Sequence, residues 1–190
     1  MNETLKTIAE RYSCRDFTGT PVTDGQIKAL VEAAAAAPSA QNRMPWHVIV
    51  INDKVLIEQL DGEGMRILAA AENKNSYERI ISRGGKMFYH APCMIIATSD
   101  GSTFSMIDCG ILIQNVALAA HSLGLGNVIC GMARVLFSGD EGEERKKRLN
   151  FPDGHGFGIS ILVGEAKCGK EPHALDMNKV TIVNRQPPVI

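Results

Sequence analysis

The longest apolar stretch of the chain, residues 104–125, limits its fold more than any other segment. It contains Asp108, Gln114, Asn115 and His121, whose polar groups would be costly in lipid, so it indicates a buried helix and not a membrane span. Over residues 104–123 the segment is apolar on nearly all sides, which predicts a central helix covered on every face.

Shorter apolar runs predict the strands of a sheet. Buried strands are expected at residues 46–51 and 93–98, because both runs are continuous and bounded by Pro or turn residues. Residues 127–132 and 159–163 predict a third and a fourth strand, and residues 180–183 are a candidate fifth. Strands spaced among helices indicate an α+β or α/β domain.

Helix signals separate these strands. A first helix is expected to end near Tyr12, and Thr23 with Gln26 forms a capping box that opens a second helix, which Pro38 stops. Residues 54–73 have helical spacing, but Asp61-Gly-Glu-Gly64 interrupts them, so two short helices with a mobile joint are expected. A charged, exposed helix is expected at residues 141–149.

Size, charge and cysteine usage exclude several classes of protein. A length of 190 residues favours one domain over residues 1–190. A net charge of -1 provides no long-range attraction to nucleic acid or to acidic membranes. The amino terminus has no signal-peptide pattern, and the five cysteines are odd in number and widely spaced, which suits reduced thiols in the cytoplasm.

Metal and nucleophile chemistry find little support. The five histidines lack the short paired spacings of metal ligands, so no metal site is expected. A Cys–His nucleophile stays open because such partners meet only in space, although Cys93 and Cys109 lie in apolar runs typical of core residues. The Gly-x-Gly-x-x-Gly pattern of dinucleotide-binding folds is absent.

The segment Arg11-Tyr-Ser-Cys-Arg15 is the first that carries chemistry. Two guanidiniums and the Ser13 hydroxyl at alternate positions would converge on one side of an extended chain, where they could hold a phosphate. An exposed basic stretch solvated by water explains these residues alone equally well.

A second segment, residues 37–47, links a helix to a strand. It places small, polar and amide side chains between Pro38 and Pro45, and Asn42 offers both a donor and an acceptor. Such a loop is stiff and lets a ligand approach its backbone. The alternative is an ordinary connection with Trp46 as core filler.

Together these segments resemble the nitroreductase family. The resemblance rests on two motifs, Arg-x-Ser-x-Arg-x-Phe near the amino terminus and Ala-Pro-Ser-Ala-x-Asn-x-x-Pro-Trp after one helix. Residues 108–131 and 158–166 are similar to that family's central helix, Gly-rich strand and late strand. The resemblance implies an α+β, three-layer sandwich with a central, mostly antiparallel sheet, two interlocked subunits, and FMN at two sites in the dimer interface.

The resemblance also assigns the site. Arg11 and Ser13 match the residues that hold the FMN phosphate. Arg15 matches the cation beside N1 and C2=O of the flavin ring. Lys86 matches a second lysine that faces the ring in some members. The loop Pro38–Asn42 is expected to reach the flavin of the partner subunit, and the backbone of Val128–Gly131 to pass near N5. Many members complete the phosphate site with an arginine or a Lys/Arg pair near the carboxyl end. This chain departs from that pattern there, with Lys170, Lys179 and Arg185 as the candidates. The expected cofactor-binding residues are Arg11, Tyr12, Ser13, Arg15, Pro38, Ser39, Ala40, Asn42, Lys86, Val128, Ile129, Cys130, Gly131 and Lys170.

The implied activity is hydride transfer from NAD(P)H through the flavin to a small acceptor such as a nitroaromatic or a quinone. The cofactor performs the difficult step, so no catalytic acid, base or nucleophile is assigned. Flavin or enone reduction, dehalogenation and non-catalytic flavin storage stay open as alternatives, as does the choice between NADH and NADPH. Residues 61–77 are a candidate cover over the ring.

Overall fold

The computed structural model describes residues 1–167, 169–172 and 174–183. Four strands form one antiparallel sheet in the order β1-β2-β4-β3. The strands are β1 (Trp46–Ile51), β2 (Cys93–Ser99), β3 (Gly126–Ile129) and β4 (Gly156–Gly164). The predicted α+β class and the mostly antiparallel sheet are therefore confirmed.

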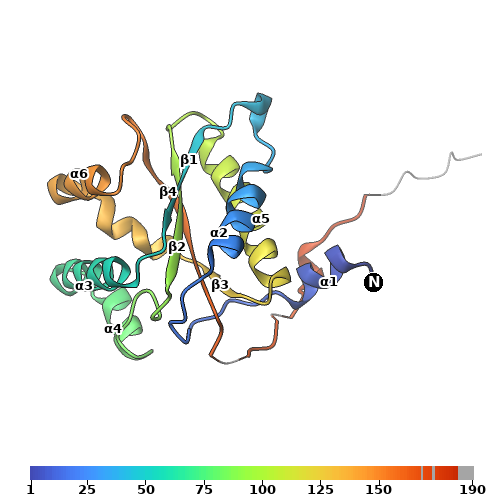
Figure 1. Ribbon diagram of the computed structural model, residues 1–190, viewed down its shortest axis with the longest axis horizontal. Helices are drawn as coiled ribbons and strands as arrows, with labels where there is room; N and C mark the ends of the chain where they lie inside the picture. Colours follow the sequence, from blue (N-terminus) through green and yellow to red (C-terminus); the bar gives the residue numbers. More distant parts are fainter. Residues whose placement is uncertain (168, 173, 184–190) are drawn as a thin grey trace, which may run out of the picture.

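Helices cover both faces of this sheet (Figure 1). One face carries α2 (Asp24–Ala35) and α5 (Ser105–Ser122). The other carries α3 (Lys54–Ala70), α4 (Asn75–Ile81) and α6 (Gly139–Arg148). The shorter elements are α1 (Glu3–Glu10) and three 3-10 turns, η1 (Ala40–Asn42), η2 (Gly131–Phe137) and η3 (Met177–Lys179). The molecule thus has the three layers that the sequence predicted.

Each face of the sheet has its own hydrophobic cluster. Leu30 of α2 and Val116 of α5 pack with Ile161 on one face. Leu60 of α3 and Leu136 of η2 pack with Met94 on the other. All seven residues of β2 are buried, because this central strand contributes side chains to both clusters.

The interrupted helical pattern at residues 61–64 forms a single helix, so the predicted mobile joint is wrong. The Asp61 carboxylate is buried in α3 and accepts a hydrogen bond from the backbone N–H of Phe88 at 2.7 Å. A Cβ on Gly64 would lie 2.2 Å from the terminal methyl of Met87. Both residues serve close packing between α3 and the segment before β2, and this tertiary contact overrides their low helix propensity.

Other boundaries also differ from the prediction. The third strand ends at Ile129, and η2 follows from Gly131. The helix α4 is short and polar and was not predicted. The predicted fifth strand is wrong, since residues 180–183 form no strand and are exposed. They belong to a segment that leaves the body of the chain beyond α1 (Figure 1), where no strand edge is available for pairing.

The helix α5 is not covered on every face within one chain. Phe104, Met106, Ile107 and Ile111 follow helical spacing and are between 37% and 62% exposed. The opposite side of α5 is fully buried at Leu112 and Val116. Within the described residues, no helix is long and apolar enough to cross a membrane.

Candidate functional site

The N-terminal segment after α1 lies against the edge of the sheet. Ser13 forms a parallel bridge to Asn127 of β3, and the backbone N–H of Cys14 donates to the Asn127 carbonyl at 2.9 Å. The buried Cys14 side chain leaves no space for a Cβ on Gly126, which would lie 3.0 Å from it. This pairing holds the segment extended, so alternate side chains point the same way.

The structure brings the predicted phosphate ligands together. Arg11, Tyr12, Ser13 and Arg15 line a hollow of about 490 Å³, which we call the N-terminal pocket, and Lys170 lines it from the carboxyl-terminal segment. Of the other two predicted basic residues, Lys179 pairs with Asp176 at 4.0 Å, and Arg185 lies outside the described residues.

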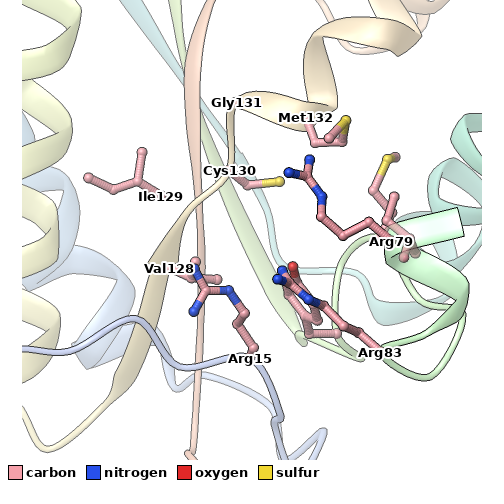
Figure 2. Close-up of a pocket in the computed structure, with 11 residues that line it drawn as sticks. Arg15, Arg79, Arg83, Val128, Ile129, Cys130, Gly131 and Met132 are labelled. Atoms are coloured by element: carbon pink, nitrogen blue, oxygen red, sulfur yellow. The ribbon is translucent and has the colours of Figure 1, made fainter. Parts of the chain in front are cut away.

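A second hollow, of about 220 Å³, adjoins the first through Arg15, and we call it the central pocket (Figure 2). One wall is the chain from β3 into η2. The other comes from α4 and the segment after it. The lining residues are Arg15, Arg79, Ile80, Arg83, Met87, Tyr89, Val128, Ile129, Cys130, Gly131 and Met132.

The wall between β3 and η2 is held by its backbone. The N–H of Cys130 donates to the Ser160 carbonyl at 2.7 Å, and the Ser160 hydroxyl donates to the Cys130 carbonyl at 2.7 Å. Both side chains are buried. Burial raises the pKa of the Cys130 thiol, which is therefore neutral at physiological pH and a poor nucleophile.

Two cations of the central pocket were missed from the sequence. Arg79 and Arg83 are four residues apart, within α4 and just after it, and both guanidiniums point into the pocket (Figure 2). Figure 2 shows Arg79 directed toward Cys130 and Arg15 entering beside Val128. The i, i+4 spacing of the two arginines is the signal that could have found them. They follow the predicted cover at residues 61–77 by only a few positions.

Lys86 has partners on α3 instead of lining the central pocket. Its ammonium is paired with the Glu58 carboxylate, and Asp61 Oδ1 lies 3.9 Å away. The hydrogen bond from Lys86 lowers the pKa of Glu58, while burial raises the pKa of Asp61. The charge of Lys86 is thus compensated within its own chain, and its contact with the flavin stays a prediction.

The loop Pro38–Asn42 lies apart from both pockets. It precedes β1 and sits at the end of the sheet opposite the N-terminal segment (Figure 1). Neither pocket has Pro38, Ser39, Ala40 or Asn42 in its lining. Gln41 and Asn42 have φ values of 56°, a left-handed conformation that is sparsely populated and often found where a backbone meets a ligand.

The described part of the chain has no metal-binding group, and its cysteines are buried. In that part of the chain, no group of three or more His, Cys, Asp and Glu residues could hold a metal ion. Cys14, Cys93, Cys109 and Cys130 are buried, and none of them forms a disulfide. Burial raises the pKa of Cys93 to about 12 and that of Cys109 to about 11, so neither thiol ionises at neutral pH.

Comparison with known structures finds close counterparts of the whole chain. A nitroreductase from Desulfitobacterium hafniense, solved with bound FMN, is 49% identical with a TM-score of 0.93, covering 97% of this chain and 100% of its own. A nitroreductase with bound FMN from Bacteroides fragilis is 26% identical with a TM-score of 0.88 and the same coverage.

Curated sequences give more distant matches. The chain is 32% identical over 135 residues to a protein of Methanothermobacter thermautotrophicus, matching 68% of this chain and 61% of the relative. It is 31% identical over 143 residues to the NADPH-flavin oxidoreductase of Vibrio harveyi, matching 70% of this chain and 55% of that protein. It thus spans less than two thirds of these two relatives.

A family model decides the assignment. The model described as the nitroreductase family matches residues 8–164. The matched range includes the N-terminal segment, both walls of the central pocket and all four strands. The chain therefore belongs to the nitroreductase family.

Proposed function

We propose that the protein is a homodimeric, FMN-dependent NAD(P)H oxidoreductase that reduces a small acceptor such as a nitroaromatic or a quinone. The observation that carries this proposal is the pair of adjoining pockets that share Arg15. The FMN bound in the similar nitroreductase of Desulfitobacterium hafniense supports it.

The donors in the two pockets fit FMN. Arg11, Ser13 and Lys170 offer two cations and a hydroxyl, which suits a phosphate. Beyond Arg15, the backbone of Val128–Gly131 forms a wall against which a flat ring could lie. Arg15 lies between the two pockets, where its charge can stabilise negative charge on the pyrimidine edge of a ring.

Bound FMN would supply a ring that accepts a hydride from NAD(P)H and passes it on to the acceptor. For a nitroaromatic, each NAD(P)H with one proton from solvent yields NAD(P)+, the nitroso product and one water. The protein binds the ring, stacks donor and acceptor in turn, and holds cations near it. No residue of the chain needs to act as acid, base or nucleophile.

Three features support a homodimer. The exposed apolar face of α5 would be covered by a second copy of the chain. The loop Pro38–Asn42 lines neither pocket of its own chain and could reach those of a partner. The carboxyl-terminal segment leaves the body with Leu175, Met177 and Ile182 exposed, as expected of an arm that packs on another subunit.

A reducing compartment, the cytoplasm, suits the thiols. The four described cysteines are buried thiols, and none of them forms a disulfide. Disulfides are common in oxidising compartments, and this part of the chain has none.

The absorbance spectrum of the purified protein tests the proposal. Bands of oxidised flavin, bleached anaerobically by NADPH or NADH and restored by menadione or a nitroaromatic, are expected. Mass spectrometry of the released cofactor should find FMN. Release of FAD, or no flavin after reconstitution, would contradict the proposal, and bleaching without turnover of any acceptor would favour storage.

A further inference from the structure

The central pocket gathers more positive charge than the proposed cofactor needs. Three guanidiniums line a hollow of about 220 Å³, and among the described residues no carboxylate forms an ion pair with any of them. Like charges gathered in a small space repel each other, and an anion between them relieves this repulsion.

Several cations that contact α3 are paired with carboxylates of that helix. Lys86 is paired with Glu58. Arg145 pairs with Glu63 at 2.5 Å, and Arg148 pairs with the same carboxylate at 3.1 Å. Arg79 in α4 and Arg83 just after it lie on the same side of the sheet, are exposed to solvent, and have no ion-pair partner in the described chain. Their charge is left available for a ligand.

The proposed cofactor does not account for this charge. Its phosphate is assigned to Arg11, Ser13 and Lys170 in the N-terminal pocket. Its ring is uncharged when oxidised, and Arg15 alone is placed at the edge that gains charge on reduction. Arg79 in α4 and Arg83 just after it point into the central pocket, where the ring is proposed to bind, as Arg15 does from the N-terminal segment (Figure 2).

We propose that Arg79 and Arg83 bind the carboxylate of a small anionic acceptor, so that the enzyme prefers acceptors carrying a negative charge near the group that is reduced. This inference rests on the proposed function. Guanidiniums bind carboxylates through paired hydrogen bonds, which also fixes the orientation of the bound molecule.

The position of the two arginines favours the acceptor over the nucleotide. They share the pocket with Cys130 and Gly131, the backbone expected beside the reactive part of the ring. The 2′-phosphate of NADPH is at the far end of the dinucleotide from its nicotinamide. A cation that reads this phosphate would therefore lie outside the ring site.

A matched pair of acceptors tests the proposal. The holoenzyme is assayed with 4-nitrobenzoate and 4-nitrobenzamide, which have a similar shape and differ in charge. The Arg79→Gln/Arg83→Gln variant should lower the ratio of their kcat/KM values, nitrobenzoate over nitrobenzamide, about tenfold, as loss of a charge-assisted contact would. A Lys28→Gln/Lys147→Gln control removes the same charge from exposed sites outside both pockets and should preserve the ratio.

Two binding measurements do not depend on turnover, and both can be made on the unaltered enzyme. Benzoate should perturb the flavin absorbance of the oxidised holoenzyme at lower concentration than benzamide, and the double variant should lose this difference. In the unaltered enzyme, added salt should weaken benzoate binding more than benzamide binding.

Each outcome decides the question. Equal binding of benzoate and benzamide, or a nitroaromatic ratio that the double variant leaves unchanged, would overturn the proposal. A rise confined to the KM for NADPH, with the KM for NADH unaffected, would assign the arginines to the nucleotide phosphate instead. If neither nitroaromatic nor menadione is reduced but benzoate still binds selectively, the proposed function fails while the anion site stands.

Discussion

The Asp108 carboxylate accepts a hydrogen bond from the backbone N–H of Ala40, with N···O distances of 3.2 and 3.3 Å. Asp108 is buried in the first turn of α5, and Ala40 begins the 3-10 turn of the loop before β1. The contact ties a loop with left-handed residues to the helix that carries the exposed apolar face. Asp108 therefore connects the proposed dimer interface with the loop expected to reach the partner's flavin.

Replacing Asp108 with Ala should loosen this loop. The Ala40 N–H loses its acceptor, at a cost of about 1–3 kcal/mol in the free energy of unfolding. Flavin affinity should fall as well, measured by fluorescence titration of the apoprotein with FMN. Asp108→Asn keeps an acceptor oxygen and serves as the control. If the Ala variant equals the Asn variant in both measurements, Asp108 does not anchor the loop.

The two arginines of the N-terminal segment should differ in effect. Arg11→Gln removes a proposed phosphate contact and should weaken FMN binding about fivefold in both redox states, corresponding to about 1 kcal/mol for a solvent-accessible charge. Arg15→Gln should instead lower the flavin midpoint potential and slow reduction by NAD(P)H, because a nearby cation favours the reduced ring. Redox titration distinguishes the effects of the two variants. A midpoint potential that is unchanged in both Arg15→Gln and Arg15→Gln/Lys86→Gln would show that neither cation faces the ring.

Cys130 should act through its backbone and not through its sulfur. Its thiol is buried with a raised pKa, while its N–H and carbonyl are both bonded to Ser160. Cys130→Ala should retain most of the bound flavin and much of the turnover rate. Ser160→Ala should have the larger effect on turnover, because the Cys130 carbonyl loses its donor. Loss of turnover with flavin retained in Cys130→Ala would revive a thiol mechanism.

The exposed face of α5 provides a test of assembly. Ile107 is 62% exposed in one chain, so Ile107→Glu should leave an isolated subunit folded but place a charge in the proposed interface. Analytical ultracentrifugation should find a dimer for the unaltered protein and dissociation for the variant, together with loss of flavin. The exposed position Gln114→Glu adds the same charge about two helical turns away and would map the extent of the interface. A flavin-loaded monomer of the unaltered protein would rule out shared sites.

Glu63 should make stability depend on pH. Burial acts to raise its pKa, but hydrogen bonds from Arg145 and Arg148 outweigh it and lower the pKa below 4.5. A carboxylate with a lowered folded-state pKa stabilises the fold above its unfolded pKa and loses this contribution as pH falls through the folded value. Glu63→Gln should therefore lower the free energy of unfolding by about 1 kcal/mol at pH 7, discounted for partial exposure.

Denaturant unfolding at several pH values checks this prediction. The difference between Glu63→Gln and the unaltered protein should shrink below pH 4.5. Glu143→Gln, at an exposed pair with Lys146, should change stability little at either pH. A Glu63→Gln difference that is constant down to pH 3 would exclude the ion pairs as its source.

Local signals allowed part of this fold to be predicted. The capping box of Thr23 and Gln26 opens α2 as expected, and β1 has the bounds that its apolar run predicted. Each depends on a few neighbouring residues. The grouping of Arg11, Ser13 and Arg15 also follows from alternation in an extended segment.

The parts that failed depend on contacts between distant residues. Gly64 and Asp61 look like helix breakers until Met87 and Phe88 pack against them. Arg79 appears as an ordinary exposed arginine, because only the folded chain brings α4 opposite Cys130. The β-strand propensity of residues 180–183 does not tell whether the edge of a sheet lies nearby for them to pair with.

The pairing of Ser13 with Asn127 has a consequence for how the cofactor site comes into being. These residues are far apart in the sequence, so their bridge closes a loop containing most of the chain, which is slow and entropically costly. The proposed phosphate ligands flanking Ser13 therefore acquire their geometry only after β3 has joined the sheet. FMN cannot act as a template for early folding intermediates. FMN can bind only the folded subunit. If the cofactor is scarce during synthesis, the protein should fold as apoprotein and bind FMN when it is added later.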